Sequence, residues 1–187
     1  MLTNITIPNC LERHNNMKKA FILIISLLFS IPTLAGSLAK ELQVFEPYLG
    51  TWQADFAVPK GQPAMQDVSQ WERALNGTAI RTLHSINDGM YGGESLIFWD
   101  KTKQSLVFYY FTTAGFYTQG TMEVLPNGAF LAYEDVTGNK DGITKVKSTS
   151  QFVDGEFKVS TQYLKNGEWT APESRSYQRS NKQVKFK

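Results

Sequence analysis

Cysteine is nearly absent from this 187-residue chain, because the only one is Cys10, close to the N-terminus. Disulfides, thiolate catalysis and cysteine-ligated zinc are therefore excluded for everything that follows residue 10. Histidine is scarce as well, with His14 and His84 as the only two. No two-histidine metal motif, phosphate-binding glycine loop or nucleophile elbow follows Ala35. The sequence thus predicts no metal and no cofactor.

An excess of charge of either sign is also lacking. The chain has 19 basic and 17 acidic residues, a formal net charge of +2. Residues 1–35 contain three of the basic and one of the acidic residues, so 16 of each sign remain in residues 36–187. Nucleic acid binding requires a basic surface, and this balance argues against it.

A hydrophobic run long enough to span a bilayer is missing too. The longest candidate, Ala20–Phe29, is about half of the roughly 20 apolar residues that a membrane-spanning helix needs. It follows Lys18 and Lys19 and precedes small residues that suit cleavage before Gly36. This order of charge, apolar core and small residues predicts a signal peptide over residues 17–35.

The flanking segments complete the predicted organisation. Residues 1–16 are polar and unpatterned, which indicates a mis-assigned start or an unusually long segment before the signal. Residues 36–187 are predicted to form one exported domain. Because no cysteine follows the apolar core, a lipid anchor is not expected. The domain is predicted to be periplasmic or secreted, with no membrane attachment after cleavage.

Turn signals recur along the predicted domain. Six Asn-Gly or Asp-Gly pairs favour the positive φ angles of tight hairpins. They are Asn76-Gly77, Asp88-Gly89, Asn127-Gly128, Asp141-Gly142, Asp154-Gly155 and Asn166-Gly167. With weaker breaks at 100–103 and 114–115, turns fall about 12 to 14 residues apart. The segments between them are rich in aromatic and β-branched residues, which predicts about ten consecutive antiparallel strands.

The predicted sheet starts with a strand at Leu49–Phe56, followed by a loop at Val58–Gln66, and ends with a strand at Trp169–Tyr177. Only Ser37–Phe45 has helical spacing, and it could plug or cover one end. Closing the sheet would remove its two edges. We therefore expect an all-β fold: an antiparallel up-and-down barrel of about ten strands with a short N-terminal helix, after a signal peptide. A flat or two-sheet arrangement is the alternative.

The start of the first strand, Leu49-Gly50-Thr51-Trp52, resembles the opening of lipocalin-like barrels. Tyr91–Asp100 and Tyr109–Thr121 resemble bacterial domains of unknown function from the same broad group, which includes nitrobindin-like and fatty-acid-binding-protein-like barrels. The resemblance implies that Gly50 permits close strand approach and that Trp52 closes the barrel floor. Nitrobindin-like proteins hold haem through a histidine on a late strand. No histidine follows His84, so the resemblance does not extend to haem.

Strand alternation assigns His84 to one face with Ile80 and Ile86, which predicts that it points inward. An inward histidine could be a general base, a proton-sensitive ligand contact or a metal ligand. No second histidine follows residue 35, so a metal would lack partners. A hydrogen-bonded core histidine is the simpler interpretation.

Charged residues share faces with aromatic ones on three further segments. Arg73 alternates with Trp71, Glu134 with Phe130, and Glu173 and Arg175 with Trp169 and Tyr177. A buried charge needs a partner or an oppositely charged ligand. Arg73 or Arg175 could thus anchor a carboxylate inside an aromatic pocket. An internal salt bridge, or a position at the barrel mouth in water, is the alternative.

The segment Leu106–Phe111 is apolar on both faces. A barrel strand with one face in water should alternate instead. Either Ser37–Phe45 or a second subunit is therefore expected to cover its outer face, and a homodimer is the favoured prediction.

Together these patterns favour an exported, non-enzymatic barrel that binds a small amphipathic, aromatic or carboxylate-bearing molecule. The predicted polar contacts are Arg73, His84, Glu134, Glu173 and Arg175, and the predicted aromatic contacts are Trp52, Phe56, Trp71, Phe108, Tyr110 and Phe130. Two alternatives stay open. One is an isomerase or hydrolase that uses His84 or Glu134 as acid or base. The other is a solidly packed structural or interaction barrel, which cavity volume would reveal.

Overall fold

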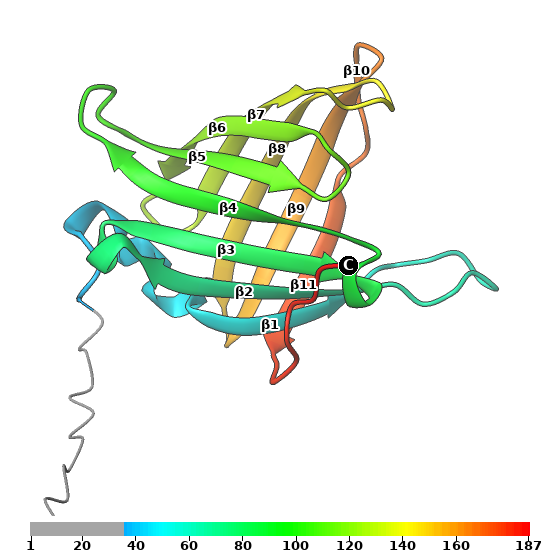
Figure 1. Ribbon diagram of the computed structural model, residues 1–187, viewed down its shortest axis with the longest axis horizontal. Helices are drawn as coiled ribbons and strands as arrows, with labels where there is room; N and C mark the ends of the chain where they lie inside the picture. Colours follow the sequence, from blue (N-terminus) through cyan, green and yellow to red (C-terminus); the bar gives the residue numbers. More distant parts are fainter. Residues whose placement is uncertain (1–35) are drawn as a thin grey trace, which may run out of the picture. The chain divides into compact units, whose positions relative to one another are not determined.

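A computed structural model describes residues 36–187, and the predicted signal peptide (17–35) and residues 1–16 lie outside that part (Figure 1). The described chain forms one antiparallel sheet. Its strands are β1 (Gly50–Asp55), β2 (Gln66–Ala74), β3 (Ala79–Ile86), β4 (Tyr91–Asp100), β5 (Ser105–Thr112), β6 (Tyr117–Val124), β7 (Phe130–Thr137), β8 (Ile143–Val153), β9 (Glu156–Lys165), β10 (Glu168–Trp169) and β11 (Glu173–Arg179). Three short 3₁₀ segments accompany them, η1 (Lys40–Tyr48), η2 (Leu75–Gly77) and η3 (Asn87–Gly89).

The sheet closes on itself as an up-and-down barrel. Consecutive strands from β1 to β9 pair with each other, and β11 pairs with both β9 and β1. The two-residue β10 only extends the edge of β9. Ten strands therefore form the closed wall, which confirms the predicted barrel and removes every long exposed edge.

The hairpin turns follow the predicted Asn-Gly and Asp-Gly pairs. In four of the six pairs both residues have positive φ, among them Asn76 (55°) with Gly77 (87°) and Asp154 (53°) with Gly155 (82°). Gly77 is also needed for space, because a Cβ atom there would lie 2.3 Å from the Ser37 carbonyl oxygen. The Asn76-Gly77 turn thus serves both the hairpin and the seating of the N-terminal segment.

The predicted N-terminal helix is a 3₁₀ segment, η1, that starts and ends three residues later than expected and plugs one end of the barrel (Figure 1). Its side chains Leu42, Phe45 and Tyr48 are at most 1% exposed. The Phe45 ring meets Phe130 at 5.2 Å between centroids, and the Trp52 indole N–H donates to the Tyr48 carbonyl oxygen at 2.6 Å. We call this end the plugged end and the opposite one the far end.

The final predicted strand is interrupted. The sequence was expected to run as one strand over Trp169–Tyr177, but β10 ends at Trp169 and β11 begins at Glu173. Pro172 lies between them and has no N–H to donate to a neighbouring strand. Both parts pair with β9, Trp169 with Leu164 and Glu173 with Thr161, so the break is a local irregularity along one edge of β9.

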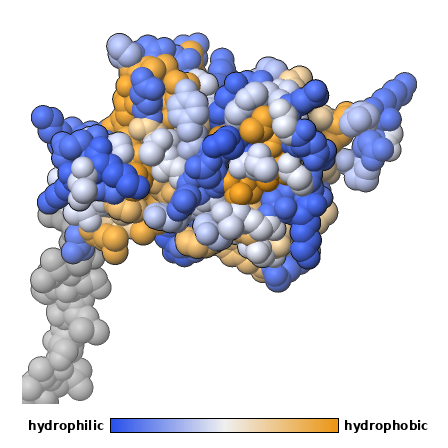
Figure 2. Space-filling view, turned by 90° about the horizontal axis from the view of Figure 1, so that it is seen from above, coloured by the Kyte–Doolittle hydropathy of each residue, from blue (hydrophilic) through white to orange (hydrophobic). Residues whose placement is uncertain are grey.

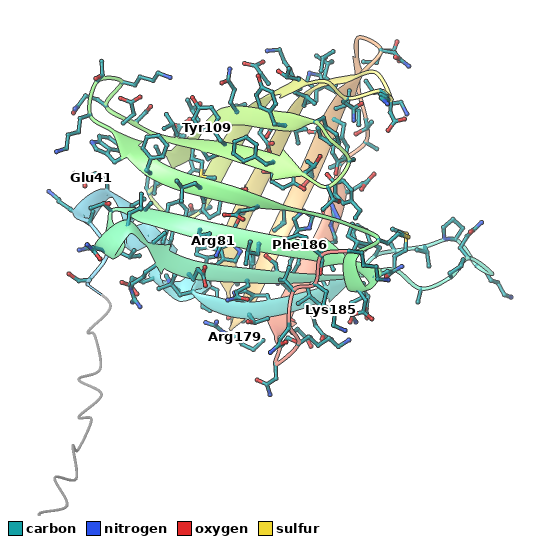
Figure 3. The ribbon with its side chains drawn as sticks, in the orientation of Figure 1. Glu41, Arg81, Tyr109, Arg179, Lys185 and Phe186 are labelled. Carbon is teal, nitrogen blue, oxygen red and sulfur yellow. The ribbon has the colours of Figure 1, made fainter. Side chains whose placement is uncertain are left out.

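The C-terminal segment lies outside the barrel wall. The Lys185 backbone N–H donates to the Ser85 hydroxyl at 3.1 Å, and the Lys185 ammonium donates to Asp88 at 2.9 Å. Figure 3 shows Lys185 and Phe186 beside the sheet. This segment explains why Ser85, an outward residue of β3, is only 2% exposed.

The outer face of β5 has no such cover among residues 36–187 at Tyr109 and Phe111. Tyr109, labelled in Figure 3, is 39% exposed and Phe111 is 57% exposed. The Phe111 ring lies 6.2 Å from that of Tyr117. The surface seen in Figure 2 likewise alternates apolar patches with hydrophilic ones. The sequence predicted that either the N-terminal segment or a second subunit covers this face. Because η1 occupies the end of the barrel, the second subunit is the one of these two that stays a prediction. No helix in this part of the chain is long and apolar enough to cross a membrane.

If a second subunit covers β5, light scattering coupled to size exclusion will give twice the monomer mass. Replacing Phe111 by Ser should then lower that mass toward the monomer, because it removes exposed apolar area from the contact. Met90→Ser is the matched control, since Met90 is 63% exposed elsewhere on the surface. A monomeric wild-type protein at the highest soluble concentration would contradict the prediction.

Candidate functional site

A cavity of about 360 Å³ occupies the barrel between the aromatic floor and the far end. Its floor consists of Trp71, Phe108, Phe130 and Phe157, which are all less than 9% exposed. Its walls continue to Phe116 and Asn139 in the loops of the far end. This volume lies in the range of known small-molecule sites, about 300 to 1,000 Å³.

Strand alternation places the polar groups on this wall. Asp67 and Ser69 lie on the same face of β2 as Trp71, and all three line the cavity. On β3 the inward residues include His84, as the sequence predicted. Because the plugged half is filled mainly by aromatic rings, the carboxylates and the histidine that line the cavity lie in its far half.

Four inward side chains from β2, β3, β4 and β5 form one hydrogen-bonded chain. The Asp67 Oδ1 and His84 Nδ1 atoms are 3.0 Å apart, and His84 Nε2 lies 2.6 Å from the Tyr110 hydroxyl. The Tyr110 and Tyr91 hydroxyls are 3.0 Å apart. The other Asp67 oxygen accepts a hydrogen bond from the Tyr177 hydroxyl at 2.7 Å. We refer to Asp67, His84, Tyr110 and Tyr91 as the hydroxyl chain.

A glycine makes room for this chain. Gly93 pairs with His84 across β3 and β4. A Cβ atom on Gly93 would lie 2.3 Å from the Tyr110 ring. Any larger residue there would push Tyr110 away from His84, so the position is restricted by close approach.

The two tyrosines of the hydroxyl chain, and Tyr177 beside it, stay protonated. Burial raises the pKa of Tyr110, Tyr91 and Tyr177 above the usual value of 10. The carboxylates of Glu134 and Asp67 add to the effect, because a tyrosinate beside them would be a like charge. Near neutral pH these phenols therefore act as hydrogen-bond partners and not as anions.

Glu134, on β7, is a buried carboxyl without a cationic partner. The Thr118 hydroxyl donates to it at 2.6 Å, and no ion pair of Glu134 forms within residues 36–187. Its remaining accessible surface faces the cavity that it lines. Burial raises its pKa to about 7, against the smaller lowering effect of the Thr118 hydrogen bond. The group therefore changes charge near neutral pH.

Arg175, on β11, is the cation of the cavity lining in the described chain. Its guanidinium lies 4.4 Å from the centroid of the Phe56 ring, and its side chain is 11% exposed. Its Nε–H is buried and has no acceptor, and its Nη2 atom lies 3.9 Å from a carboxylate oxygen of Glu173. The Trp71 indole N–H is a second buried donor without an acceptor. Both residues line the cavity.

Most of the predicted site residues meet in this cavity. His84, Glu134, Arg175, Trp71 and Tyr110 line it, as do the predicted aromatic contacts Phe56, Phe108 and Phe130.

Three predicted site residues do not line the cavity. Arg73 shares the face of Trp71 but lies past the floor, at the plugged end, where it binds Glu46 at 2.6 Å. Trp52 is fully buried behind the floor, with the Arg179 guanidinium 3.8 Å from its ring. Glu173 is exposed at the far end beside Arg175. Strand alternation predicts whether each of these side chains points inward or outward, but not where it lies along the barrel axis.

Four ionisable lining residues were missed as site residues: Asp67, Tyr91, Tyr163 and Tyr177. Asp67 follows the predicted loop directly, so its strand position was not considered. The alternation of Asp67, Ser69 and Trp71 would have placed it inside. The two later tyrosines needed only the same alternation within β9 and β11.

The raised pKa of Glu134 predicts a specific pH dependence of stability. A carboxyl that titrates near 4.5 when unfolded and about 7 when folded binds more protons in the folded state between these values. The free energy of unfolding must therefore fall as the pH rises through this window. Glu134→Gln should remove up to about 3 kcal/mol of that loss. Urea unfolding at several pH values tests this, with exposed Glu123→Gln as the control, and parallel curves for wild type and Glu134→Gln would refute it.

Comparisons with known proteins support the fold and no more. No protein-family model matches the chain, and no curated protein matches it. Among solved structures, the chain is similar to Rv2717c from M. tuberculosis, with 13% sequence identity and a TM-score of 0.57. The alignment covers 78% of this chain and all of that one. The protein therefore shares an antiparallel ten-stranded barrel with Rv2717c.

Proposed function

We propose that this protein is an exported barrel that binds a small, largely aromatic molecule carrying a carboxylate, inside the cavity of its far half. The observation that carries the proposal is Arg175, a cation on the wall of an apolar cavity with a buried N–H that has no acceptor. Unpaired buried donors are costly, and a ligand oxygen would satisfy this one.

The cavity lining supports the aromatic part of the proposal. Trp71, Phe108 and Phe130 offer flat apolar surfaces at the floor, and Phe56 covers one face of the Arg175 guanidinium. A planar guanidinium donates two parallel hydrogen bonds to a carboxylate, which a lysine does not. A ligand with an apolar ring and one carboxylate would thus fit this cavity, with its ring against the aromatic floor and its carboxylate at Arg175.

The cavity volume argues against a solidly packed structural barrel. An interior filled by side chains leaves few voids larger than a water molecule. The 360 Å³ found here is far larger, and its wall contains polar groups that packing alone would not favour. A ligand site is therefore the better explanation of the interior.

Acid–base catalysis in the same cavity is the second candidate. His84 lies within hydrogen-bond distance of both Asp67 and Tyr110, and Glu134 titrates near neutral pH. Such a set could move a proton to or from a bound substrate. Turnover of a bound probe would favour this candidate, whereas release of the probe unchanged favours binding.

The proposal also includes export of the protein and its relationship to known barrel families. Among residues 36–187 the first buried side chain is Leu38, two residues after Gly36, so the described fold begins directly after the predicted cleavage point. We also infer kinship with lipocalin-like and nitrobindin-like barrels, for which the closed ten-stranded wall and the plug under Trp52 are the support.

Arg175→Met should weaken binding of 2-naphthoate, a minimal aromatic carboxylate, by about 10-fold or more, because a charge-assisted hydrogen bond is lost. Calorimetry or quenching of naphthalene fluorescence measures the affinity. Arg73→Met is the matched control, since Arg73 lies outside the cavity. Equal affinities for wild type and Arg175→Met would overturn the carboxylate anchor.

Expression of the full chain in a Gram-negative host should yield a periplasmic protein whose N-terminus is Gly36. Intact-mass spectrometry of the periplasmic fraction measures this directly. Replacing Ile24 by Arg should interrupt the apolar core of the signal and leave the protein in the cytoplasm. Recovery of wild-type protein with Met17 or Met1 at its N-terminus would contradict the cleaved signal.

A further inference from the structure

The hydroxyl chain has a fixed direction of hydrogen bonding. With Asp67 ionised, its two oxygens accept from Tyr177 and from His84 Nδ1. A neutral His84 then has only a lone pair at Nε2, so the Tyr110 hydroxyl must donate to it. Tyr110 has thereby used its proton, and the Tyr91 hydroxyl must donate to the Tyr110 oxygen. In this state Tyr91 has no proton left for a ligand and presents only lone pairs.

One added proton reverses the whole chain. When the Asp67–His84 pair holds a further proton, on either partner, His84 Nε2 becomes a donor to the Tyr110 oxygen. Tyr110 then donates to Tyr91, and the Tyr91 hydroxyl proton is released from the chain. Within residues 36–187 the Tyr91 hydroxyl has no hydrogen-bond partner other than Tyr110, and its side chain lines the cavity. Its proton is then free for a ligand.

We propose that Tyr91 is a second recognition point in the cavity, whose role changes from acceptor to donor when the Asp67–His84 pair takes up a proton. The ligand class that follows is an aromatic carboxylate with a second oxygen at its other end. The carboxylate lies at Arg175, as proposed above, and the second oxygen meets Tyr91. This inference thus rests on the proposed function and adds what the ligand carries opposite its carboxylate.

The other ionisable groups around His84 do not reproduce this reversal. Tyr91, Tyr110 and Tyr177 face the pair from β4, β5 and β11, and burial raises their pKa so that they stay protonated. Glu134, on β7, changes the charge of the cavity near neutral pH but is not hydrogen-bonded to the chain. Arg175 keeps its charge throughout. A test must therefore separate Tyr91 from Glu134.

Two probes that differ only at the oxygen opposite the carboxylate, measured on the wild-type protein and on Tyr91→Phe, achieve this separation. Both 6-hydroxy-2-naphthoate and 6-methoxy-2-naphthoate carry the same ring and carboxylate, so effects that act on these shared parts, such as that of Arg175, cancel in the ratio of their affinities. A contact between the far oxygen and Glu134 would persist in Tyr91→Phe, whereas a contact with Tyr91 would not. Only the hydroxy probe can donate to Tyr91, while both can accept from it. Calorimetry at about pH 5.5 and about pH 8.5 brackets the range where histidines usually titrate.

The hydroxy probe should bind the wild-type protein about fivefold tighter than the methoxy probe at the alkaline pH, the usual effect of one hydrogen bond. At the acid pH the two affinities should be equal. Tyr91→Phe should make the two affinities equal at the alkaline pH as well, and Tyr110→Phe should make the preference independent of pH by breaking the chain. Tyr109→Phe, which changes the neighbouring outward residue, is the control and should behave as wild type.

The outcomes separate the two proposals. If both probes bind with the same ratio at every pH, or if Tyr91→Phe keeps the preference, the inference is overturned and the carboxylate site stands. If neither probe nor 2-naphthoate binds the folded wild-type protein, the proposed function is overturned and the inference with it. Circular dichroism of each variant establishes that it is folded, and Tyr91→Phe at the rim is the variant least expected to disturb the interior.

Discussion

The aromatic plug at one end of the barrel determines the polarity of the rest of the interior. Phe45 and Tyr48 from η1 meet Trp71, Phe130 and Phe157 from the wall, at ring-centroid distances of 5.0 to 6.0 Å. Together with aliphatic side chains such as Ile80, Ile97 and Ala132, these rings fill the interior at the plugged end. Since each strand alternates, the inward polar residues can only lie above this layer. The plug therefore fixes both the floor of the cavity and the place where its chemistry can be.

Burial of the polar groups above the floor is energetically tolerable only where they form hydrogen bonds with one another or with a ligand. Asp67 is 5% exposed and receives a hydrogen bond from Tyr177, which is 110 residues away in sequence. This contact joins β2 to β11 across β1, where the barrel closes. The carboxylate thus stabilises closure and orients His84 at the same time. Arg175 and Trp71 lack such partners for one N–H each, and they are the groups that a ligand would complete.

Sequence patterns predict this fold where local chemistry decides it. Asn-Gly and Asp-Gly pairs define the hairpins, because few other residues adopt positive φ so readily. By contrast, most residues of β8 before Phe152 are polar, so this segment lacks the usual strand signal. The contacts between strands decide that segment. Alternation likewise assigned Arg73 and Arg175 to inward faces, but the position of the plug leaves only Arg175 in the cavity.

The surroundings of His84 favour binding over direct catalysis by this residue. Both ring nitrogens already have partners, Nδ1 with Asp67 and Nε2 with Tyr110. A base or a metal ligand would need one nitrogen free toward the cavity, which would break a bond to a half-buried group. In the proposed arrangement, a change in the protonation of His84 therefore reaches a ligand through the hydrogen bonds of the Tyr110 and Tyr91 hydroxyls. His84 itself lines the cavity, with its side chain 24% exposed, so the hydrogen bonds of its two nitrogens and not its burial limit direct proton transfer to a ligand.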